Sequence, residues 1–505
     1  MKLVESLLLG SLACLIAAAG APAADVGPLS QAPLDYARVC DVYGAGFFSI
    51  PGTGACLKVG GLVYGETRVY SDGFKLGNAA VWANGVKAGT LPSIANFQPA
   101  GRGQFGWDGL GSIEFDFRNP TAYGPLRAFA RIDSIFGGGA SAATGVLSTV
   151  NGGAFNNVNA SQDVKDVTFV SKAFLQFAGL TAGRAQSMFD FYADAYNWEG
   201  LRGSNATTQL LAYTATFGDG FSTTMSIEDP NARRGAIGSV ITGDQAYYAS
   251  GRAPDIVGNL RLDQSWGSLQ ITGAGHEVRS NLVGSSASAV PPANLGFPTA
   301  TSDQWGFAAQ GGVSFNLPAL APGDKLWLQA TYEKGAVGYI TGNNAAYTAG
   351  ATNTAPGYGN GVSEGLSSPL GWDPQYAQDC TWTGTARCEQ QWGFAFAGAL
   401  KHYWTPNISS AFFSSYMEQH YAADALAGFG GAIGPANIKE ARAGTNLIWS
   451  PILGLDIGGE FMYERLSVSM PAGLAPNPAL NAAGLPAFQP TQNLFEGRIR
   501  VERAF

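Results

Sequence analysis

The sequence is poor in charge and in long hydrophobic runs, and each shortage excludes a class of protein. Charged residues make up 13% of the 505 residues, against about 25% in ordinary soluble domains. Beyond the N-terminal apolar stretch, no uninterrupted apolar run reaches the roughly 20 residues that a membrane-spanning helix needs. The composition therefore excludes a helical membrane protein and is unusual for a soluble one.

Basic charge and histidine are scarce as well. The formal net charge is −8, which argues against a nucleic-acid partner because nucleic-acid binding needs a basic surface. His276, His402 and His420 show no metal-ligand spacing, and neither HExxH nor GxSxG occurs. The glycines at 137–139 are followed by neither a lysine nor a predicted helix, so they do not form a phosphate-binding loop. We predict no catalytic site, no cofactor and no metal site.

The N-terminus indicates export. Lys2 is followed by an apolar stretch and by a small-x-small cleavage signal at 21–23. We expect residues 1–23 to be a signal peptide and residues 24–505 to form a single domain. Lipidation of Cys14 is an alternative, but the sequence before it lacks the expected branched residue three places upstream.

The other four cysteines form two close pairs, Cys40 with Cys56 and Cys380 with Cys388. Even, local pairing in an exported chain predicts two disulfides formed in an oxidising compartment. Free buried thiols are the alternative, and the Gly, Pro and Asp residues around these cysteines disfavour it. Zinc is disfavoured too, because there is no CxxC and no histidine near either pair.

What the chain does contain is strict alternation of apolar and polar residues, which is the two-residue period of a β-strand. The C-terminal segment places apolar side chains on one face and a dense row of charges on the other, as a strand between lipid and water requires. Sixteen segments alternate in this way, each about the length of a tilted membrane strand, ~9–11 residues. They are 57–70, 112–118, 126–136, 167–177, 180–186, 209–217, 221–228, 256–264, 269–278, 306–315, 326–333, 392–403, 408–420, 438–449, 455–464 and 493–505.

The links between these segments alternate between short and long. Short links such as 218–220 and 404–407 contrast with long ones such as 137–165 and 335–391, whose composition predicts surface coil. An even number of antiparallel strands with tight turns at one end and large loops at the other is the plan of an outer-membrane barrel. We therefore predict an all-β fold, a transmembrane antiparallel β-barrel of about 16 strands.

One link differs from the others. Residues 187–205 are compact, aromatic and acidic, so we expect this segment to fold inward as a constriction loop whose carboxylates, Asp190, Asp194 and Glu199, face the lumen. By parity, arginines on the early strands face the same space, and opposed rows of charge would orient polar solutes there. The alternative is that these arginines only neutralise acidic residues of the wall. The predicted basic members of the constriction are Arg68, Arg118, Arg127, Arg131 and Arg184.

Four segments resemble the alphaproteobacterial porins of the Rhizobiales type. They are MKLVESLLLGS at the start, CDVYGAGFFSIPGTGACLKVGG at 40–61, TAGRAQSMFDFY at 181–192 and GRIRVERAF at 497–505. The resemblance spans essentially the whole chain. It implies a sixteen-stranded homotrimeric general diffusion porin of the Gram-negative outer membrane, whose third extracellular loop, here 187–205, folds into the barrel. It further implies contact with outer-membrane lipid and lipopolysaccharide, and insertion by the barrel-assembly machinery through a C-terminal signal at Phe505.

Together these observations predict a water-filled passive channel for small hydrophilic solutes and ions. A substrate-selective channel for a sugar or an oxyanion is the nearest alternative. An outer-membrane hydrolase would need a Ser or His constellation that the spacing does not supply. A structural or adhesive role would need a lumen filled by side chains, whereas sixteen strands leave an aqueous passage.

Overall fold

A computed structural model describes residues 39–70, 80–83, 86–90, 105–139, 165–241, 245–249, 251–283, 300–341, 378–427, 436–469 and 490–505. The predicted signal peptide lies outside the described residues. Within these ranges, no helix is both long enough and apolar enough to cross a membrane.

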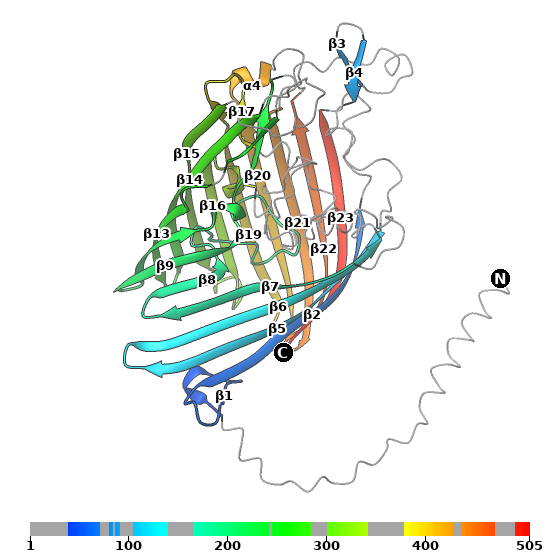
Figure 1. Ribbon diagram of the computed structural model, residues 1–505. Coiled ribbons are helices and arrows are strands. Elements are labelled where there is room, and N and C mark those ends of the chain that lie inside the picture. The colour runs from blue at the N-terminus through cyan, green and yellow to red at the C-terminus, as the bar shows by residue number, and fades with distance from the viewer. Residues whose placement is uncertain are drawn as a thin grey trace, which may run out of the picture.

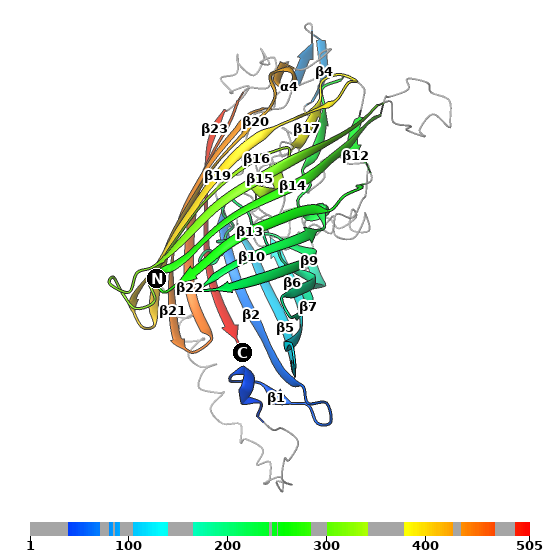
Figure 2. The same ribbon diagram turned by 90° about the vertical axis from the view of Figure 1, so that its left-hand side faces the viewer.

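Sixteen antiparallel strands close into one barrel (Figures 1 and 2). Each strand pairs with the next barrel strand along the chain, and β23 pairs back onto β2 through partners such as Ile499 and Thr67, which closes the sheet. The predicted fold class and all sixteen predicted strands are confirmed. The barrel strands are β2 (Cys56–Tyr70), β5 (Phe105–Thr121), β6 (Gly124–Gly139), β7 (Lys165–Phe177), β8 (Leu180–Gln186), β9 (Thr207–Gly218), β10 (Phe221–Glu228), β13 (Asp255–Gln264), β14 (Gly267–Val283), β15 (Ala300–Asn316), β16 (Lys325–Lys334), β19 (Trp392–Thr405), β20 (Ile408–His420), β21 (Ile438–Ile452), β22 (Leu455–Val468) and β23 (Thr491–Ala504).

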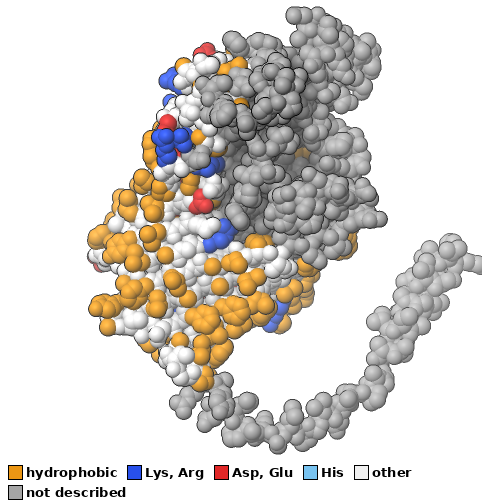
Figure 3. Space-filling view, viewed as in Figure 1, with side chains coloured by type: hydrophobic (Ala, Val, Ile, Leu, Met, Phe, Trp, Pro, Cys, Tyr) orange, Lys and Arg blue, Asp and Glu red, His pale blue; other side chains and the backbone are white. Residues whose placement is uncertain are grey.

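The alternation of apolar and polar residues gives the barrel an outer and an inner surface of different character. Outward positions such as Val63, Ile113 and Ile499 are exposed apolar side chains, whereas the inward positions Glu66 and Arg498 are buried and charged. The outer wall is accordingly covered with hydrophobic side chains in its lower part (Figure 3). Strands such as β2 and β23 thus present apolar side chains to lipid and charged ones to the interior, as a membrane barrel requires.

The end of the chain extends the barrel seam by one residue. The backbone N–H of Phe505 donates to the carbonyl of Gly61 at 3.0 Å, and the N–H of Gly61 donates back at 3.1 Å. The ring of Phe505 lies against Gly61, where a β-carbon would come within 2.5 Å of it. A glycine at position 61 therefore makes room for the terminal aromatic ring.

Shorter elements sit on the two ends of the barrel. Near the short turns lie η2 (Asp41–Tyr43) and β1 (Phe48–Ser49), which pairs with β2. At the opposite end, in both views, lie α4 and β17 (Figures 1 and 2). The remaining elements belong to the long links: β3 (Ala80–Ala83), β4 (Val86–Thr90), η3 (Pro230–Ala232), β11 (Ala236–Ser239), β12 (Gln245–Tyr248), η4 (Val337–Tyr339), β17 (Gln378–Trp382), β18 (Cys388–Gln390) and α4 (Ala423–Ala427).

The expectation of surface coil is wrong for the described ends of the link 335–391. Residues 378–390 form the β17–β18 hairpin, and β17 also pairs in parallel with β11. Trp382 and Val337 in this link are fully buried. We call η4 and the β17–β18 hairpin together the cap. It is ordered because its apolar side chains pack on inward residues of β14, a tertiary contact that the sequence of the link does not reveal.

Both predicted disulfides are present. Cys40 bonds to Cys56, where the N-terminal segment joins β2, and Cys380 bonds to Cys388 across the β17–β18 hairpin. Both sulfurs of the second disulfide are fully buried in the cap. One disulfide therefore secures each end of the barrel.

Candidate functional site

Residues 187–206, between β8 and β9, form a loop inside the barrel, which we call the inner loop. It has no regular structure, so its backbone groups need partners from the wall. Inward polar side chains on five strands supply them. Asn259 Nδ2 donates to the Met188 carbonyl (2.7 Å), Gln310 Nε2 to that of Phe189 (3.0 Å) and Asn446 Nδ2 to that of Tyr196 (2.8 Å), while Gln329 Oε1 and Ser415 Oγ accept from the N–H groups of Tyr192 (3.1 Å) and Arg202 (3.0 Å).

Apolar contacts hold the same loop against the strands that follow it. Tyr192 and Leu201 are buried among small inward residues of β19 and β20, such as Ala397 and Ala411. The ring of Phe191 fills the space above Gly312, where a β-carbon would come within 2.3 Å of it. Small residues on these strands therefore let the loop lie close to the wall. The inner loop is part of the packed interior of the molecule rather than a free segment.

The tip of the loop is a tight turn stabilised by one carboxyl group. Ala193 and Asp194 have positive φ values of 47° and 54°, a strained region for residues with a side chain. Asp194 accepts hydrogen bonds from the N–H of Leu201 at 3.0 Å and from the amides of Asn197 and Asn205, both at 2.9 Å. Burial raises the pKa of Asp194, and these neutral donors only partly offset that effect. Asp194 therefore acts as a turn-stabilising acceptor.

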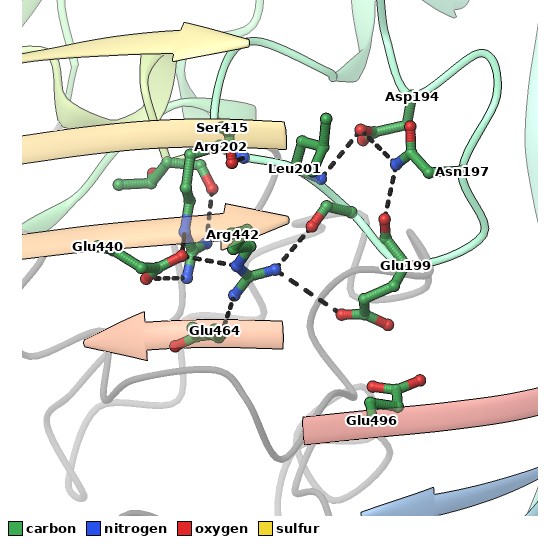
Figure 4. A network of polar contacts seen from close by, with 12 residues as sticks. Asp194, Asn197, Glu199, Leu201, Arg202, Ser415, Glu440, Arg442, Glu464 and Glu496 are labelled. Carbon is green, nitrogen blue, oxygen red and sulfur yellow. Dashed lines mark hydrogen bonds and ion pairs between the residues drawn. The ribbon is translucent and has the colours of Figure 1, made fainter. Parts of the chain in front are cut away.

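Glu199 and Arg202 carry the loop into a network of buried charges (Figure 4). Arg442 on β21 lies at its centre, with Nη1 3.8 Å from Glu199 and Nη2 3.0 Å from Glu464. Arg202 binds both carboxylate oxygens of Glu440, at 2.7 and 2.9 Å. Two-point binding of this kind fixes orientation as well as distance.

The network continues along β23 to β2. Arg498 donates to Glu199 and to Glu496, and Arg68 Nη1 lies 3.9 Å from Glu199. In the described part of the chain, eleven linked side chains, each at most 6% exposed, make up this cluster. They are the guanidinium groups of Arg68, Arg202, Arg442, Arg498 and Arg500 and the carboxyl groups of Glu66, Glu199, Glu440, Glu460, Glu464 and Glu496.

The pKa of Glu199 is raised, as the composition of this charged cluster leads us to expect. Burial and the neighbouring Glu496 raise the pKa of Glu199 to about 7, while Arg498 lowers it. The eleven side chains comprise six carboxyl groups and five guanidinium groups, so repulsion between carboxyl groups adds to the effect of burial. Such strongly interacting groups titrate together.

A second anchor ties the loop to the cap. Arg233 Nη2 donates to Asp190 at 2.8 Å, and the guanidinium group of Arg233 lies 4.5 Å from the ring centre of Tyr339 in η4. Burial lowers the pKa of Arg233, but its neighbours, Asp190 foremost, together more than compensate, so that its pKa is raised overall. The N–H of Gly203 also donates to the carbonyl of Ile340 at 2.8 Å. The inner loop and the cap are therefore joined through Arg233, which contacts both Asp190 and Tyr339, and through a backbone hydrogen bond.

The predicted acidic and basic residues meet only in part. Arg68 reaches Glu199, but the two side chains are buried together rather than opposed across an aqueous gap. The other predicted arginines of β5 and β6 bind acidic residues of their own wall instead, at half-exposed positions. Arg118 and Arg127 bind Asp116 (2.8 and 3.0 Å), and Arg131 binds Asp133 (2.7 Å) and Glu114 (3.4 Å).

Arg184 lies on the other face of the wall. The strand register pairs it with Gln209 and places it on the same side as Leu180 and Ala182, whose partners Tyr213 and Leu211 are exposed outward side chains. Inward positions of β8 are small instead, as at Ala185, because the inner loop begins directly after this strand and packs there. Arg184 therefore does not face the loop.

Sequence reasoning missed the arginines that hold the loop. These are Arg202 on the loop, Arg233 beyond η3, Arg442 on β21 and Arg498 on β23. The sequence does indicate the two arginines on strands, Arg442 and Arg498, because each alternates with glutamates on the inward face of its strand. What the pattern does not show is which wall the loop touches.

His276 of β14 and Asp255 of β13 form a buried hydrogen-bonded group with residues of the cap. His276 Nδ1 lies 2.7 Å from Asp255, which also accepts from the hydroxyl of Tyr339 at 2.8 Å. Asp379 of β17 accepts from the N–H of Val337 at 2.8 Å. Across the described ranges, no set of three or more His, Cys, Asp or Glu side chains is arranged to hold a metal ion. We interpret the group as a structural part of the cap.

Comparison with known proteins gives a consistent picture. A family model described as "Porin subfamily" matches residues 28–481. The chain is 31% identical over 276 residues to Porin Omp2b of Brucella abortus strain 2308, and 30% identical over 272 residues to Porin Omp2b of Brucella melitensis biotype 1. Each alignment covers 53% of this chain and 64% of the relative, so the chain spans less than two thirds of the length of the curated relatives it matches. Among solved structures, the outer membrane channel DcaP of Acinetobacter baumannii has the same fold, with a TM-score of 0.52 at 15% identity, covering 90% of this chain and 98% of that one.

Proposed function

Because this chain belongs to the porin subfamily and is an outer-membrane β-barrel, we propose that it forms a water-filled channel for the passive diffusion of small hydrophilic solutes and ions. The observation that carries the proposal is the inner loop, which lies within a closed sixteen-stranded barrel and is held by strands from β13 through β23 to β2, opposite β5 and β6. A barrel of this size leaves an aqueous passage unless segments fill it. A loop held to one side narrows that passage without closing it.

The two sets of predicted constriction residues have different roles in this proposal. Asp190, Asp194 and Glu199 set the position of the loop, since all three are engaged by buried partners. The half-exposed arginines of β5 and β6, each paired with a carboxylate of the same wall, lie opposite the loop, where these exposed ion pairs act on ions in the lumen. The loop therefore sets the width of the passage, and the arginines influence its selectivity.

The family indicates a channel rather than an enzyme, and we propose that the chain has no catalytic activity. We also propose that it functions as a homotrimer within outer-membrane lipid and lipopolysaccharide, with residues 24–505 forming one domain. The exposed apolar side chains of the outer wall support contact with lipid and with neighbouring subunits (Figure 3). The pairing of Phe505 with Gly61 supports a role for the terminal aromatic residue in assembly by the barrel-assembly machinery.

A planar-bilayer measurement tests the function. The purified protein should produce stepwise conductance that rises in proportion to salt concentration, and a KCl gradient should give a finite reversal potential. Liposomes containing the protein should swell in isotonic solutions of small neutral sugars, at rates that fall with sugar size. A folded, inserted protein without conductance would contradict the proposal. Conductance that saturates with one solute would favour the alternative of a substrate-selective channel.

A further inference from the structure

Two lysines face each other on adjacent strands just beyond the inner loop. Lys325, the first residue of β16, is the direct partner of Lys401 on β19. Directly opposed residues of antiparallel strands share a face, with β-carbons about 5 Å apart, and like charges at such positions repel. Both side chains share the inward face with Trp327 and Ala399, which pack with the inner loop. The barrel thus places two like charges together on its inner surface.

Aromatic rings lie next to the two ammonium groups, and the charge of Asp263 on β13 acts on Lys325 without forming an ion pair with it. Lys325 Nζ is 4.4 Å from the ring centre of Trp327, and Lys401 Nζ is 5.0 Å from that of Tyr403 and 5.6 Å from that of Tyr196 on the inner loop. Within the described ranges, neither lysine forms an ion pair. An aromatic face attracts a cation but leaves its charge in place.

The arginines of β5 and β6 show how this barrel normally neutralises an inward cation. Arg118, Arg127 and Arg131 each have a carboxylate within 3.0 Å. Arg261 on β13, whose charge acts on Lys325, is held by Asp263 at 2.9 Å. Lys325 and Lys401 depart from this rule. Each ammonium group has three hydrogen-bond donors, and an aromatic ring face occupies only some of them.

We propose that Lys325 and Lys401 form a binding site for a phosphate group, free or carried by a small organic solute, on the side of the inner loop nearest the short turns. One doubly charged oxyanion neutralises both ammonium groups at once and accepts hydrogen bonds from each. Trp327, Tyr196 and Tyr403 provide apolar surface for the organic part of a phosphate ester. Trp327 also packs on Phe191 of the inner loop, with ring centres 4.8 Å apart, so the site begins where the constriction ends.

This inference rests on the proposed channel function, and one bilayer experiment separates the two. Single channels in KCl are titrated with inorganic phosphate in one series and with glucose 6-phosphate in another, with glucose as the neutral control. We expect both phosphates to reduce the chloride current in a saturable way. Lys325→Gln and Lys401→Gln should each weaken the apparent affinity about fivefold, and the double variant about 25-fold, as expected for one charge pair in water each.

Lys439→Gln is the matched control. Lys439 lies on β21, is 55% exposed and binds Glu418 at 3.1 Å, outside the lumen, so this variant should bind phosphate as the unmodified protein does. A conducting channel without a phosphate effect, or a double variant with unchanged affinity, would overturn the site and leave the channel intact. An effect of inorganic phosphate alone would limit the ligand to the free ion. Absence of conductance would instead overturn the proposed function, and migration as a folded, heat-resistant species checks each variant.

Discussion

Two walls of this barrel carry the same inward alternation of arginine and acidic residues but differ in what covers them. On the late wall, formed by β21, β22, β23 and β2, Arg442 and Arg498 are 1% exposed because the inner loop lies over them. On the early wall, formed by β5 and β6, Arg127 and Arg131 are 29% and 24% exposed and face the lumen. The difference shows that coverage by the loop, rather than local sequence, decides whether an inward arginine is buried or exposed to the lumen.

Burial also changes what each ion pair contributes. A half-exposed pair such as Arg131–Asp133 contributes about 0–1 kcal/mol, because water screens it. Within the covered cluster every charge has lost its water, so removing one partner leaves another buried charge uncompensated. The late wall therefore holds the loop firmly, although its charges were costly to bury.

The largest loss of stability should come from removing the arginine at the centre of the buried cluster on the late wall. Arg442→Met removes the centre of the cluster and leaves Glu440, Glu464 and Glu199 short of a partner. We expect a loss of about 3–5 kcal/mol in the free energy of unfolding, together with a larger and noisier single-channel current as the loop loosens. Urea unfolding followed by circular dichroism measures the first, and planar bilayers the second.

Arg131→Met on the early wall is the matched control, since it makes the same chemical change at a half-exposed position. Its cost should stay within about 1 kcal/mol. Equal losses of stability in the two variants would contradict the contrast between the walls.

The sequence was sufficient for the barrel but only partly for the site. Each strand has its own two-residue alternation of apolar and polar side chains, so all sixteen strands could be identified from local sequence. The same alternation correctly placed Arg68 on the inner face of the barrel. The composition of residues 187–205 identified the loop that enters the barrel. Which strands the loop meets depends on packing between segments far apart in the chain, such as Tyr192 on Ala397 of β19, and no local pattern encodes it.

Two further errors have equally physical causes. Arg184 was assigned to the lumen, but β8 turns its small residues inward to admit the start of the loop. The link 335–391 was expected to be coil because it is rich in small residues, yet Trp382 and the disulfide give its second end a core. In both places tertiary packing overrides local composition.

The cap allows the second anchor of the inner loop, at Asp190, to be weakened without touching the late wall. Cys380→Ser with Cys388→Ser opens the β17–β18 hairpin, which is joined through η4 to Arg233 and Gly203. We expect a loss of about 2 kcal/mol and added fluctuation of the open-channel current, since the anchor at Asp190 is loosened. The measurement is current noise in single-channel records.

The other disulfide supplies the control. Cys40→Ser with Cys56→Ser removes a disulfide at the short-turn end, next to Arg118 of the early wall and away from the inner loop. Open-channel noise should stay at the level of the unmodified protein. Noise that rises in this variant but not in the cap variant would reverse our assignment of which region steadies the loop.

A smaller effect should appear in selectivity when the early wall loses charge. Arg127→Gln with Arg131→Gln removes two half-exposed cations that face the lumen. The ratio of cation to anion permeability should rise about twofold, because each charge acts on a passing ion through water and salt. Reversal potentials in a KCl gradient report this ratio. Lys439→Gln, whose side chain lies outside the lumen, should leave it unchanged.

The smallest effect should come from Asp194→Asn within the loop itself. Asp194 is held by neutral donors, so an isosteric amide keeps most of its hydrogen bonds, and we expect unchanged reversal potentials and a stability change within about 1 kcal/mol. Burial raises the pKa of Asp194 above its ordinary value of 3.8. The folded state therefore binds this proton more tightly than the unfolded chain, and the stability from this group is present at low pH and falls as the pH rises through the raised pKa. The variant should lose that part of the pH dependence, which urea midpoints measured from about pH 4 upward will show. A reversal potential that shifts toward anions would instead place this carboxylate in the path of the ions and remove the distinction between the anchored loop and the charged wall.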